Sequence, residues 1–391
     1  MSDALIVSAV RTPVASAFRG TLRRTEPADL AIPVLSALVK QSALPVGLVD
    51  DVVLAESLHG GGDIARYSAI EAGLTNVPGL ALNRHCAGGL SAVMVAANAV
   101  CAGGDRAVIA GGVQSSSTAP VLRSRLDPET DWLFESHRPT PQAPADDMSI
   151  TVGWNAARQA GISREEQDAW ALRSHQRALA AISAGQFVDE IVPLMIPDES
   201  GDPQVFAVDE HPRATTSAEK LAALPVLHPE IEGFTVTAGN ASGINDAAAA
   251  LLVVSSEVAA EHGLAPLARI RAGASVGVDP EDTGMSAPLA IRKALARAGL
   301  QVTDVDLWEI NEAFASVPIA ASRELGLDEG TVNPFGSGCS IGHPVAATGA
   351  RMLTTLSHEL FRRGGGIAVA AMCAGGGMAS AVVLDVPGTG R

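Results

Sequence analysis

ADLAIPVLSALVKQSALPVGLVDDVVLAE (residues 28–56) has apolar residues at three- and four-residue steps, then a turn, a Val-Asp step and a short strand-like run ending in glutamate. APLAIRKALARAGLQVTDVDLWEINE (287–312) repeats these parts in the same order. Any two helix–strand units can look alike. A second match favours duplication, because RAVIAGGV (106–113) resembles IAVAAMCAGGG (367–377). We therefore predict two duplicated halves.

Short apolar strands that alternate with helices predict an α/β protein whose sheets are covered on both faces. The segment between about residues 115 and 234 differs in character. It is rich in proline and acidic residues, and it continues into an amphipathic helix that begins at a capping box of Ser163 and Glu166. We interpret it as an insertion. The expected division is a first half from 1–118 and 235–265, an inserted loop domain from 119–234, and a second half from 266–391.

The bulk composition narrows the class of protein. The 391 residues are 47% hydrophobic and 3% aromatic, and the net charge of −16 argues against nucleic acid or an anionic membrane as the main partner. We see no apolar run long enough to span a bilayer and no signal peptide at the amino terminus. The four cysteines form no CxxC pair, which favours free thiols and no metal site. These features predict a cytoplasmic protein.

NRHCAGGL (83–90) places Cys86 at the start of an apolar helix. Free backbone N–H groups and the helix dipole at that position favour a thiolate, and Gly88 and Gly89 leave room for a substrate. Cys86 is therefore a candidate nucleophile. It could instead be a redox partner, or pack as a small apolar side chain, as we expect for Cys101 in the same helix.

Three further segments carry candidate chemistry. His343 lies in a tight glycine-rich loop before Pro344, and it could be a base for the Cys86 thiol or an exposed turn residue. Cys373 ends a strand and runs into three glycines, where a second thiol could be a resolving cysteine or an acid/base group. Asn311 and Glu312 follow a strand in WEINEAFA, and polar residues at that junction could orient a substrate carbonyl or cap a helix.

The chain resembles the thiolases over essentially its whole length. NRHCAGGLSAV, GNASGINDAAA, NEAFA, GHPVAATGAR and MCAGGG occur in the order and spacing of that family, and IVSAVRTPV and GISREEQDAWALRSHQRA also fit. The resemblance implies a five-layer αβαβα fold of two duplicated halves with an inserted loop domain. It also implies a homodimer or homotetramer, acyl-CoA substrates, coenzyme A as substrate rather than a resident cofactor, and a place in fatty acid metabolism such as β-oxidation.

The resemblance also implies roles for individual residues. Cys86 matches the nucleophile that carries the acyl group, His343 the base that activates it, and Cys373 the acid/base group at the α-carbon of acetyl-CoA. Asn311 matches the residue that fixes a water with His343 in one oxyanion hole, and the backbone N–H groups of Cys86 and Gly375 would form the second. Such donors stabilise a developing enolate.

Further matches concern binding. Arg213 matches an arginine near the adenine end of coenzyme A, and Ser242 a serine that bonds the pantetheine arm; a solvated loop arginine and a turn serine are the plain alternatives. Met148, Met285 and Phe314 match positions that line the acyl pocket, or they could be ordinary core residues.

Several positions depart from the family pattern. Gly88 replaces a serine in the nucleophile loop, Phe335 replaces an asparagine, and Thr348 replaces a serine. Residues 147–149 read Asp-Met-Ser where the family commonly has His-Met-Gly, and TVGWN (151–155) is one residue longer than the usual TAEN. These departures bear on the acyl pocket and on the loop that forms the oligomer in the family, so a chain-length preference cannot be carried over.

The expected activity is acyl transfer: thiolytic cleavage of a 3-ketoacyl-CoA, or its reverse Claisen condensation, through a Cys86 thioester with ping-pong kinetics. The alternatives are a non-catalytic acyl-CoA-binding protein and a decarboxylating ketoacyl-synthase-type enzyme. The second Cys, Cys373, argues against the latter.

Overall fold

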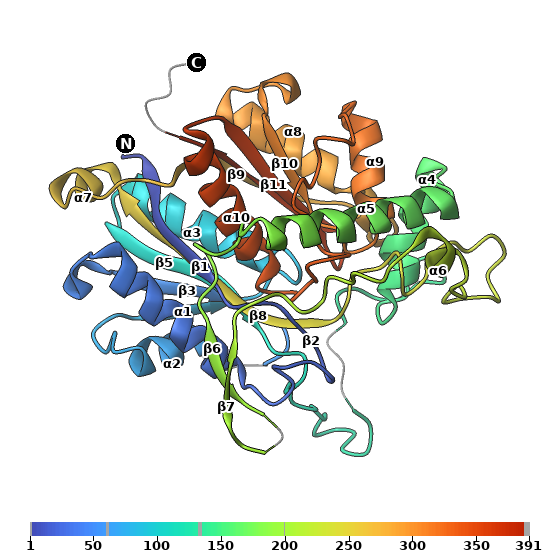
Figure 1. The fold of residues 1–391 in the computed structure, drawn as a ribbon, viewed down its shortest axis with the longest axis horizontal. Helices are drawn as coiled ribbons and strands as arrows, with labels where there is room; N and C mark the ends of the chain where they lie inside the picture. Colours follow the sequence, from blue (N-terminus) through green and yellow to red (C-terminus); the bar gives the residue numbers. More distant parts are fainter. Residues whose placement is uncertain (1, 60–61, 132–134, 199, 387–391) are drawn as a thin grey trace.

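A ten-stranded sheet forms the centre of the computed structural model, which describes residues 2–59, 62–131, 135–198 and 200–386 (Figure 1). The strand order is β10-β11-β12-β9-β1-β8-β5-β3-β4, with β2 paired to β8 beside this path. The strands of this sheet are β1 (Ala4–Arg11), β2 (Ala15–Ser16), β3 (Asp51–Ala55), β4 (Gly79–Leu82), β5 (Ala107–Gln114), β8 (Asn245–Ser255), β9 (Ala268–Gly277), β10 (Leu307–Ile310), β11 (Ile367–Ala374) and β12 (Met378–Asp385).

The strand pairing repeats itself in the two halves of the chain. In the first half β3 is parallel to β5, β5 is antiparallel to β8, and β8 is antiparallel to β1. In the second half β10 is parallel to β11, β11 is antiparallel to β12, and β12 is antiparallel to β9. The halves meet where their equivalent first strands, β1 and β9, pair antiparallel. The predicted duplication is confirmed. The two similar sequence segments, 28–56 and 287–312, each form a helix and the strand that follows it, which is β3 in the first half and β10 in the second.

Helices cover and separate the two halves of the sheet in five layers (Figure 1). The helices of these layers are α1 (Pro27–Ser42) and α2 (Ile64–Glu71) outside the first half, α3 (Gly88–Ala102) and α10 (Thr348–Arg363) in the middle, and α8 (Ala287–Ala298) and α9 (Ser316–Leu325) outside the second half. One buried cluster joins α3 and α10 to both halves of the sheet, and two further clusters lie under the outer helices. The predicted αβαβα arrangement is confirmed.

The two central helices touch at their amino-terminal ends. A Cβ on Gly89 would lie 2.7 Å from the backbone nitrogen of Ala350 and 2.9 Å from the carbonyl oxygen of Ala346. A Cβ on Gly349 would lie 2.4 Å from the backbone nitrogen of Leu90. Because these contacts are with backbone atoms, only glycine allows the two helix starts to approach so closely. The loops that precede both helices are thereby brought together.

The chain leaves the sheet between β5 and β8. In the second half the equivalent strands, β11 and β12, are joined by a short glycine turn. The elements of this excursion are α4 (Asn155–Ala160), α5 (Arg164–Ser183), β6 (Leu194–Pro197), β7 (Pro203–Phe206) and α6 (Ala218–Ala222), and α7 (Ser256–Glu261) follows β8. The predicted capping box of Ser163 and Glu166 is present at the start of α5. Figure 1 shows α5 across the second half and the β6–β7 hairpin extending away from the body.

Residues 149–154 form a π-helical turn, Ser149–Trp154, immediately before α4. A π-turn holds one residue more than an α-helical turn. It falls where the sequence is one residue longer than the family pattern, so the extra residue is absorbed as a local widening of the helix rather than as a loop. Such turns occur frequently at functional sites.

One sequence prediction needs correction. Residues 85–102 are long and apolar enough to cross a membrane by length and composition, although we predicted no such run. In the fold 56% of this segment is buried, and its helical part is α3, the central helix of the core. Its apolar character follows from packing between two halves of the sheet.

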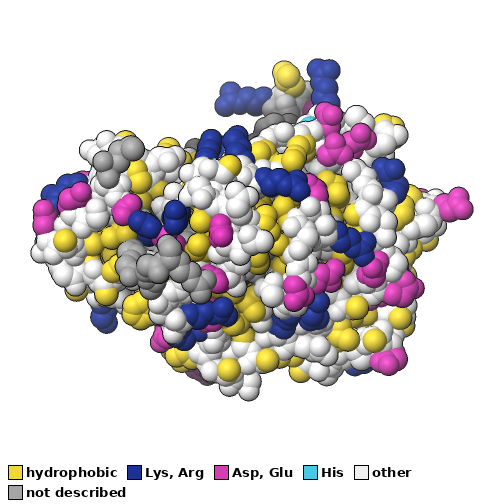
Figure 2. Space-filling model, turned by 90° about the horizontal axis from the view of Figure 1, so that it is seen from above, with side chains coloured by type: hydrophobic (Ala, Val, Ile, Leu, Met, Phe, Trp, Pro, Cys, Tyr) yellow, Lys and Arg dark blue, Asp and Glu magenta, His cyan; other side chains and the backbone are white. Residues whose placement is uncertain are grey.

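Figure 2 shows acidic and basic side chains interspersed over one face of the molecule.

Candidate active site

Cys86 lies two residues before α3, whose N-cap is Ala87. The residue is half-buried, and the backbone N–H groups of Gly375 and of Cys86 itself lower the pKa of the thiol. Burial has the larger effect and raises this pKa to about 11. The expected stabilisation of a thiolate by the helix start is therefore outweighed, and the resting thiol keeps its proton at neutral pH.

Cys373 lies near the end of β11 and is 2% exposed. Burial, together with the repulsion that a Cys86 thiolate would exert, raises the pKa of its thiol to about 12. The two cysteines are far apart in sequence but lie near each other in the fold. All four cysteines of the chain are free thiols in this structure.

The glycine turn after Cys373 places the Gly375 backbone beside Cys86. Gly376 and Gly377 have φ angles of 80° and 74°, and a Cβ on Gly377 would lie 2.1 Å from the carbonyl oxygen of Val278. Only glycine combines that conformation with that approach. The turn is therefore fixed in the shape that aims an N–H group at the Cys86 sulfur.

His343 is 6% exposed and is held on both its backbone and its ring. Its N–H donates to Oδ1 of Asn245 at 2.9 Å, and its Nδ1 lies 2.7 Å from Oγ1 of Thr348. Burial and, to a smaller extent, the positive charge of Arg351 lower the pKa of His343 to about 4. The ring is therefore neutral at pH 7, as a general base must be.

Asn311 follows β10 and is fully buried. Its Nδ2 lies 3.4 Å from Nδ1 of His343, at the long end of hydrogen bonding. Within the described residues, Oδ1 of Asn311 and Nε2 of His343 are buried and have no hydrogen-bond partner. Buried polar atoms are rarely left unpaired, so each of these two atoms is a candidate to bond a substrate or a water.

Sheet pairing links the two groups of candidate residues. Ile310 of β10 is in register with Ala371 of the parallel strand β11, and the N–H of Asn311 donates to the carbonyl of Ala371. Asn311 and Cys373 therefore lie at the carboxyl ends of neighbouring strands, which are spaced by about 5 Å. His343 lies beside Asn311, and Cys86 lies beside Cys373, so the four side chains gather at this end of the sheet.

The GNASG segment joins the other motifs through its backbone. The N–H of Ser242 donates to the carbonyl of Ala313 at 2.9 Å, Ala241 forms a bridge with Phe314, and Ile244 forms one with His343. Ser242 is half-buried. The segment therefore lies directly against the region that holds Asn311 and His343.

Two of the three expected pocket residues reach the site. Met148 and Phe314 are partly buried and pack on a cluster formed by Val152, Ala313, Val317 and Cys373. Met285 instead packs on the cluster beneath α8 and α9, at the end of the turn Pro280–Met285. Arg213 is exposed; its backbone N–H donates to Nδ1 of His175, and in the described part of the chain its guanidinium forms no ion pair.

Sequence reasoning assigned no role to Thr348 or Asn245, and it grouped Glu312 with Asn311 as a residue that could orient a substrate carbonyl or cap a helix. Glu312 is buried and accepts hydrogen bonds from Trp170, Ser174, Asn333 and the backbone of Cys339, which fixes the residue that follows Asn311. Asn245 and Thr348 hold His343. All three lie inside the quoted motifs, so motif membership was the available signal.

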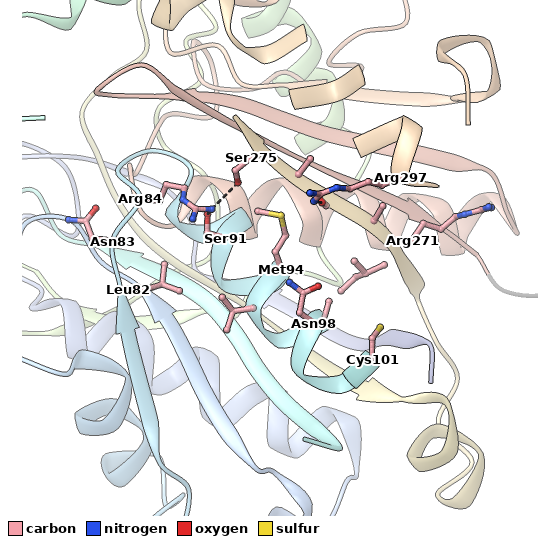
Figure 3. A pocket seen from close by; sticks show the side chains of 16 residues that line it. Leu82, Asn83, Arg84, Ser91, Met94, Asn98, Cys101, Arg271, Ser275 and Arg297 are labelled. Carbon is pink, nitrogen blue, oxygen red and sulfur yellow. Dashed lines mark hydrogen bonds between the residues drawn. The ribbon is translucent and has the colours of Figure 1, made fainter. Parts of the chain in front are cut away.

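A cavity of about 460 Å³ opens beside α3 and β9 (Figure 3). None of the candidate catalytic, coenzyme-binding or acyl-pocket residues lines it. Arg84 crosses one end of it and donates to Ser91 and Ser275 at 3.0 and 2.8 Å, while Met94, Asn98 and Cys101 of α3 line its floor. The described residues contain no group of three or more His, Cys, Asp or Glu side chains placed to hold a metal ion.

Two duplicated α/β halves around a shared pair of central helices, with two neighbouring thiols at the end of the sheet, define a class of five-layer αβαβα proteins. Comparison with known families gives the particular one. The family model described as "Thiolase, N-terminal domain" matches residues 4–257, and the model described as "Thiolase, C-terminal domain" matches residues 264–386. The chain belongs to the thiolase family, whose members act on coenzyme A thioesters without a resident cofactor.

Individual relatives agree over the full length. An acetyl-CoA acetyltransferase of Pseudomonas aeruginosa is 41% identical, and the alignment covers 98% of this chain and 99% of the relative. A β-ketoadipyl-CoA thiolase of Acinetobacter baylyi is 40% identical, with 98% of this chain and 100% of the relative covered. The crystal structure of the Bacillus anthracis acetyl-CoA acetyltransferase has a TM-score of 0.89 at 39% identity, covering 98% of this chain and 99% of that one. The non-catalytic and ketoacyl-synthase alternatives are not favoured by these matches.

Proposed function

We propose that this thiolase cleaves a 3-ketoacyl-CoA with coenzyme A, or runs the reverse condensation, through an acyl thioester on Cys86. The observation that carries the proposal is the unpartnered, buried Nε2 of neutral His343 in a site that also holds two protonated thiols. A neutral imidazole can take a proton that a thiol gives up, and the uncharged resting site costs little to bury.

The first half-reaction uses both thiols. His343 takes the Cys86 proton as the sulfur attacks the C3 carbonyl, and the C2–C3 bond then breaks. Cys373 gives its proton to C2, which releases acetyl-CoA and leaves the acyl group on Cys86. In the second half-reaction the Cys373 thiolate takes the proton of incoming coenzyme A, whose sulfur attacks the thioester. Cys86 leaves and recovers its proton from His343, so protons and bonds balance.

Two groups of donors would stabilise the oxyanions. The N–H groups of Cys86 and Gly375, which already approach the sulfur, suit the carbonyl oxygen of the acyl thioester. His343, once protonated on Nε2, and a water held by Asn311 suit the enolate oxygen, and the two unpartnered buried atoms support this assignment.

For binding, we propose that Ser242 holds the pantetheine arm and Arg213 the adenine end, within the inserted segment 119–234 and its junction. Met148 and Phe314 would line the acyl pocket, since both pack with Cys373. Met285 would lie outside that wall, at the neighbouring turn. The 3-ketoacyl class is proposed without a chain length, because the relatives include both an acetyltransferase and a β-ketoadipyl-CoA thiolase.

We also propose a cytoplasmic homodimer or homotetramer. The strand β4 ends the sheet with a free edge, and Leu80 on that strand is 44% exposed. An edge of this kind presents backbone N–H and C=O groups that can pair with a strand of another chain. Sedimentation of the purified protein tests this assembly, and the catalytic proposal is tested by mass spectrometry of the acyl adduct on Cys86 after brief exposure to 3-ketoacyl-CoAs of increasing chain length.

A further inference from the structure

The π-helical turn Ser149–Trp154 lies at the wall of the proposed acyl pocket. It follows Met148 directly, and its residues Val152 and Gly153 are buried. Val152 belongs to the same apolar cluster as Cys373, on which Met148 and Phe314 pack. The turn therefore shapes the surface that an acyl group would meet beside the second thiol.

Gly153 has a contact that no other residue type could make without a shift. A Cβ on Gly153 would lie 2.8 Å from both Cγ and Cδ1 of Phe314 and 3.1 Å from Cγ2 of Val236. The ring of Phe314 thus lies against bare backbone. The carbonyl of Gly153 is in turn fixed, because it accepts a hydrogen bond from Oγ of Ser316 at 2.8 Å.

Both ends of the turn are held by one neighbouring segment, residues 228–234. At the start, Asp147 accepts hydrogen bonds from the N–H and Oγ of Ser149 and pairs with Nε2 of His228 at 2.8 Å. At the end, the ring of Trp154 lies 5.4 Å from that of Phe234, which in turn contacts the ring of His228 edge-on at 5.0 Å. The turn is therefore braced and not free to relax into a regular helix.

We propose that this π-turn determines acyl-group selectivity, with Gly153 as the residue that sets the position of the Phe314 ring. The inference rests on the proposed thiolase function and names the part of the pocket that selects the acyl chain. A methyl group on Gly153 pushes the ring away from the turn and toward the Cys373 side. The space for a long acyl chain then shrinks, whereas an acetyl group still fits.

The test compares four versions of the full-length protein: the unmodified chain, Gly153→Ala, Gly153→Ala with Phe314→Leu, and Phe314→Leu alone. Gly47→Ala is the matched control, because a Cβ there meets open space. Calorimetry measures the affinities for acetyl-CoA and for the longest saturated acyl-CoA that the unmodified chain binds. Thiolysis of the corresponding 3-ketoacyl-CoAs is measured separately.

Gly153→Ala is expected to lower the ratio of long-chain to acetyl affinity by about ten-fold or more, the scale of one misplaced methyl group in an apolar pocket. Phe314→Leu should raise the ratio, the double variant should return it toward the unmodified value, and Gly47→Ala should leave it unchanged. If Gly153→Ala does not fold, Phe314→Leu alone decides. An unchanged ratio in the folded variants overturns the inference.

The two proposals fail in different ways. Altered affinity ratios without thiolysis in any version would overturn the thiolase activity but keep the selectivity role of the turn. Thiolysis with unchanged ratios would keep the activity and overturn the selectivity role. Failure of every version to bind any acyl-CoA would overturn both.

Discussion

Thr348 fixes the tautomer of His343. Oγ1 of Thr348 lies 2.9 Å from the carbonyl oxygen of Pro344 and 2.7 Å from Nδ1 of His343. A hydroxyl has one proton, and a carbonyl can only accept, so the Thr348 proton goes to Pro344. Nδ1 of His343 must then carry the ring proton and donate it to Thr348, so the 3.4 Å approach of Nδ2 of Asn311 to Nδ1 is a contact and not a hydrogen bond. Nε2 is left with its lone pair, in the form that a general base needs.

Thr348→Val should therefore impair catalysis more than folding. The valine keeps the shape but neither accepts from Nδ1 nor bonds Pro344, so the Nε2-protonated tautomer becomes populated. We expect kcat to fall by about 10²-fold, within the range for loss of a positioned general base. Thr348→Ser, which restores the hydroxyl, should keep kcat within a few-fold. Equal losses in both variants would show that the hydroxyl does not act through the histidine.

The two thiols should separate by partial reaction. Cys86→Ser should abolish acyl transfer, because a serine alkoxide is far harder to form than a thiolate. Cys373→Ser should still form a slow acyl-enzyme but should block exchange of the α-protons of acetyl-CoA with solvent deuterium. NMR measures the exchange, and mass spectrometry measures the adduct. Loss of every partial reaction in both variants would contradict the division of roles.

Gly89→Ala should destabilise the fold at the contact between α3 and α10. The added Cβ meets backbone atoms of Ala350 and Ala346 at 2.7 and 2.9 Å, which cannot move independently. We expect a loss of about 1–3 kcal/mol in the free energy of unfolding, as for other overpacked cores. Gly104→Ala, whose nearest neighbouring atom is 3.7 Å away, serves as the control. Urea unfolding checks both, and a Gly89→Ala protein as stable as the control would disprove the close approach.

Acid should destabilise the protein through its buried histidines. Burial lowers the pKa of His175, His211 and His343 to about 4 in the folded state. The unfolded chain binds these protons near pH 6.5, so it takes up more protons than the folded chain between pH 6.5 and 4. The free energy of unfolding therefore falls as the pH decreases through this window. Each histidine contributes up to about 1.4 kcal/mol per pH unit.

His211→Gln tests this account by removing one of the three groups. The variant should show a smaller difference between its urea stabilities at pH 7.5 and 5 than the unmodified protein. His262→Gln is a suitable control, because His262 lies at the exposed end of α7. Equal pH dependence in the His211→Gln and unmodified proteins would rule out the proposed protonation.

The sequence predicted those features that local patterns determine. The repeated helix–strand segments predicted the duplication, the Ser163–Glu166 spacing predicted the start of α5, and the helical spacing of the apolar residues after Cys86 predicted α3. Local patterns could not show the raised pKa of Cys86, because the burial that causes it arises in the folded protein. The role of Thr348 depends on a helix start that faces the histidine loop, and the π-turn depends on bracing by Asp147–His228 and Trp154–Phe234.

The prediction about membrane-length runs failed for a related reason. In residues 85–102 a few polar residues interrupt the alanine, valine and methionine, so the segment contains no unbroken apolar run. Its mean hydropathy is nevertheless 1.4. A helix packed between two halves of a sheet is apolar almost all round, and composition does not distinguish it from a helix in lipid. The five-layer fold explains its composition.

The central claim is that Cys86 carries the acyl group, and intact-mass spectrometry with peptide mapping tests it most directly. The unmodified protein is exposed briefly to a series of 3-ketoacyl-CoAs of increasing chain length, with the Cys86→Ser variant alongside. The account predicts an acyl adduct that maps to Cys86, matches the acyl chain supplied and is absent from the variant. A folded protein that binds coenzyme A but forms no adduct with any chain length, or forms it on another residue, would contradict the account.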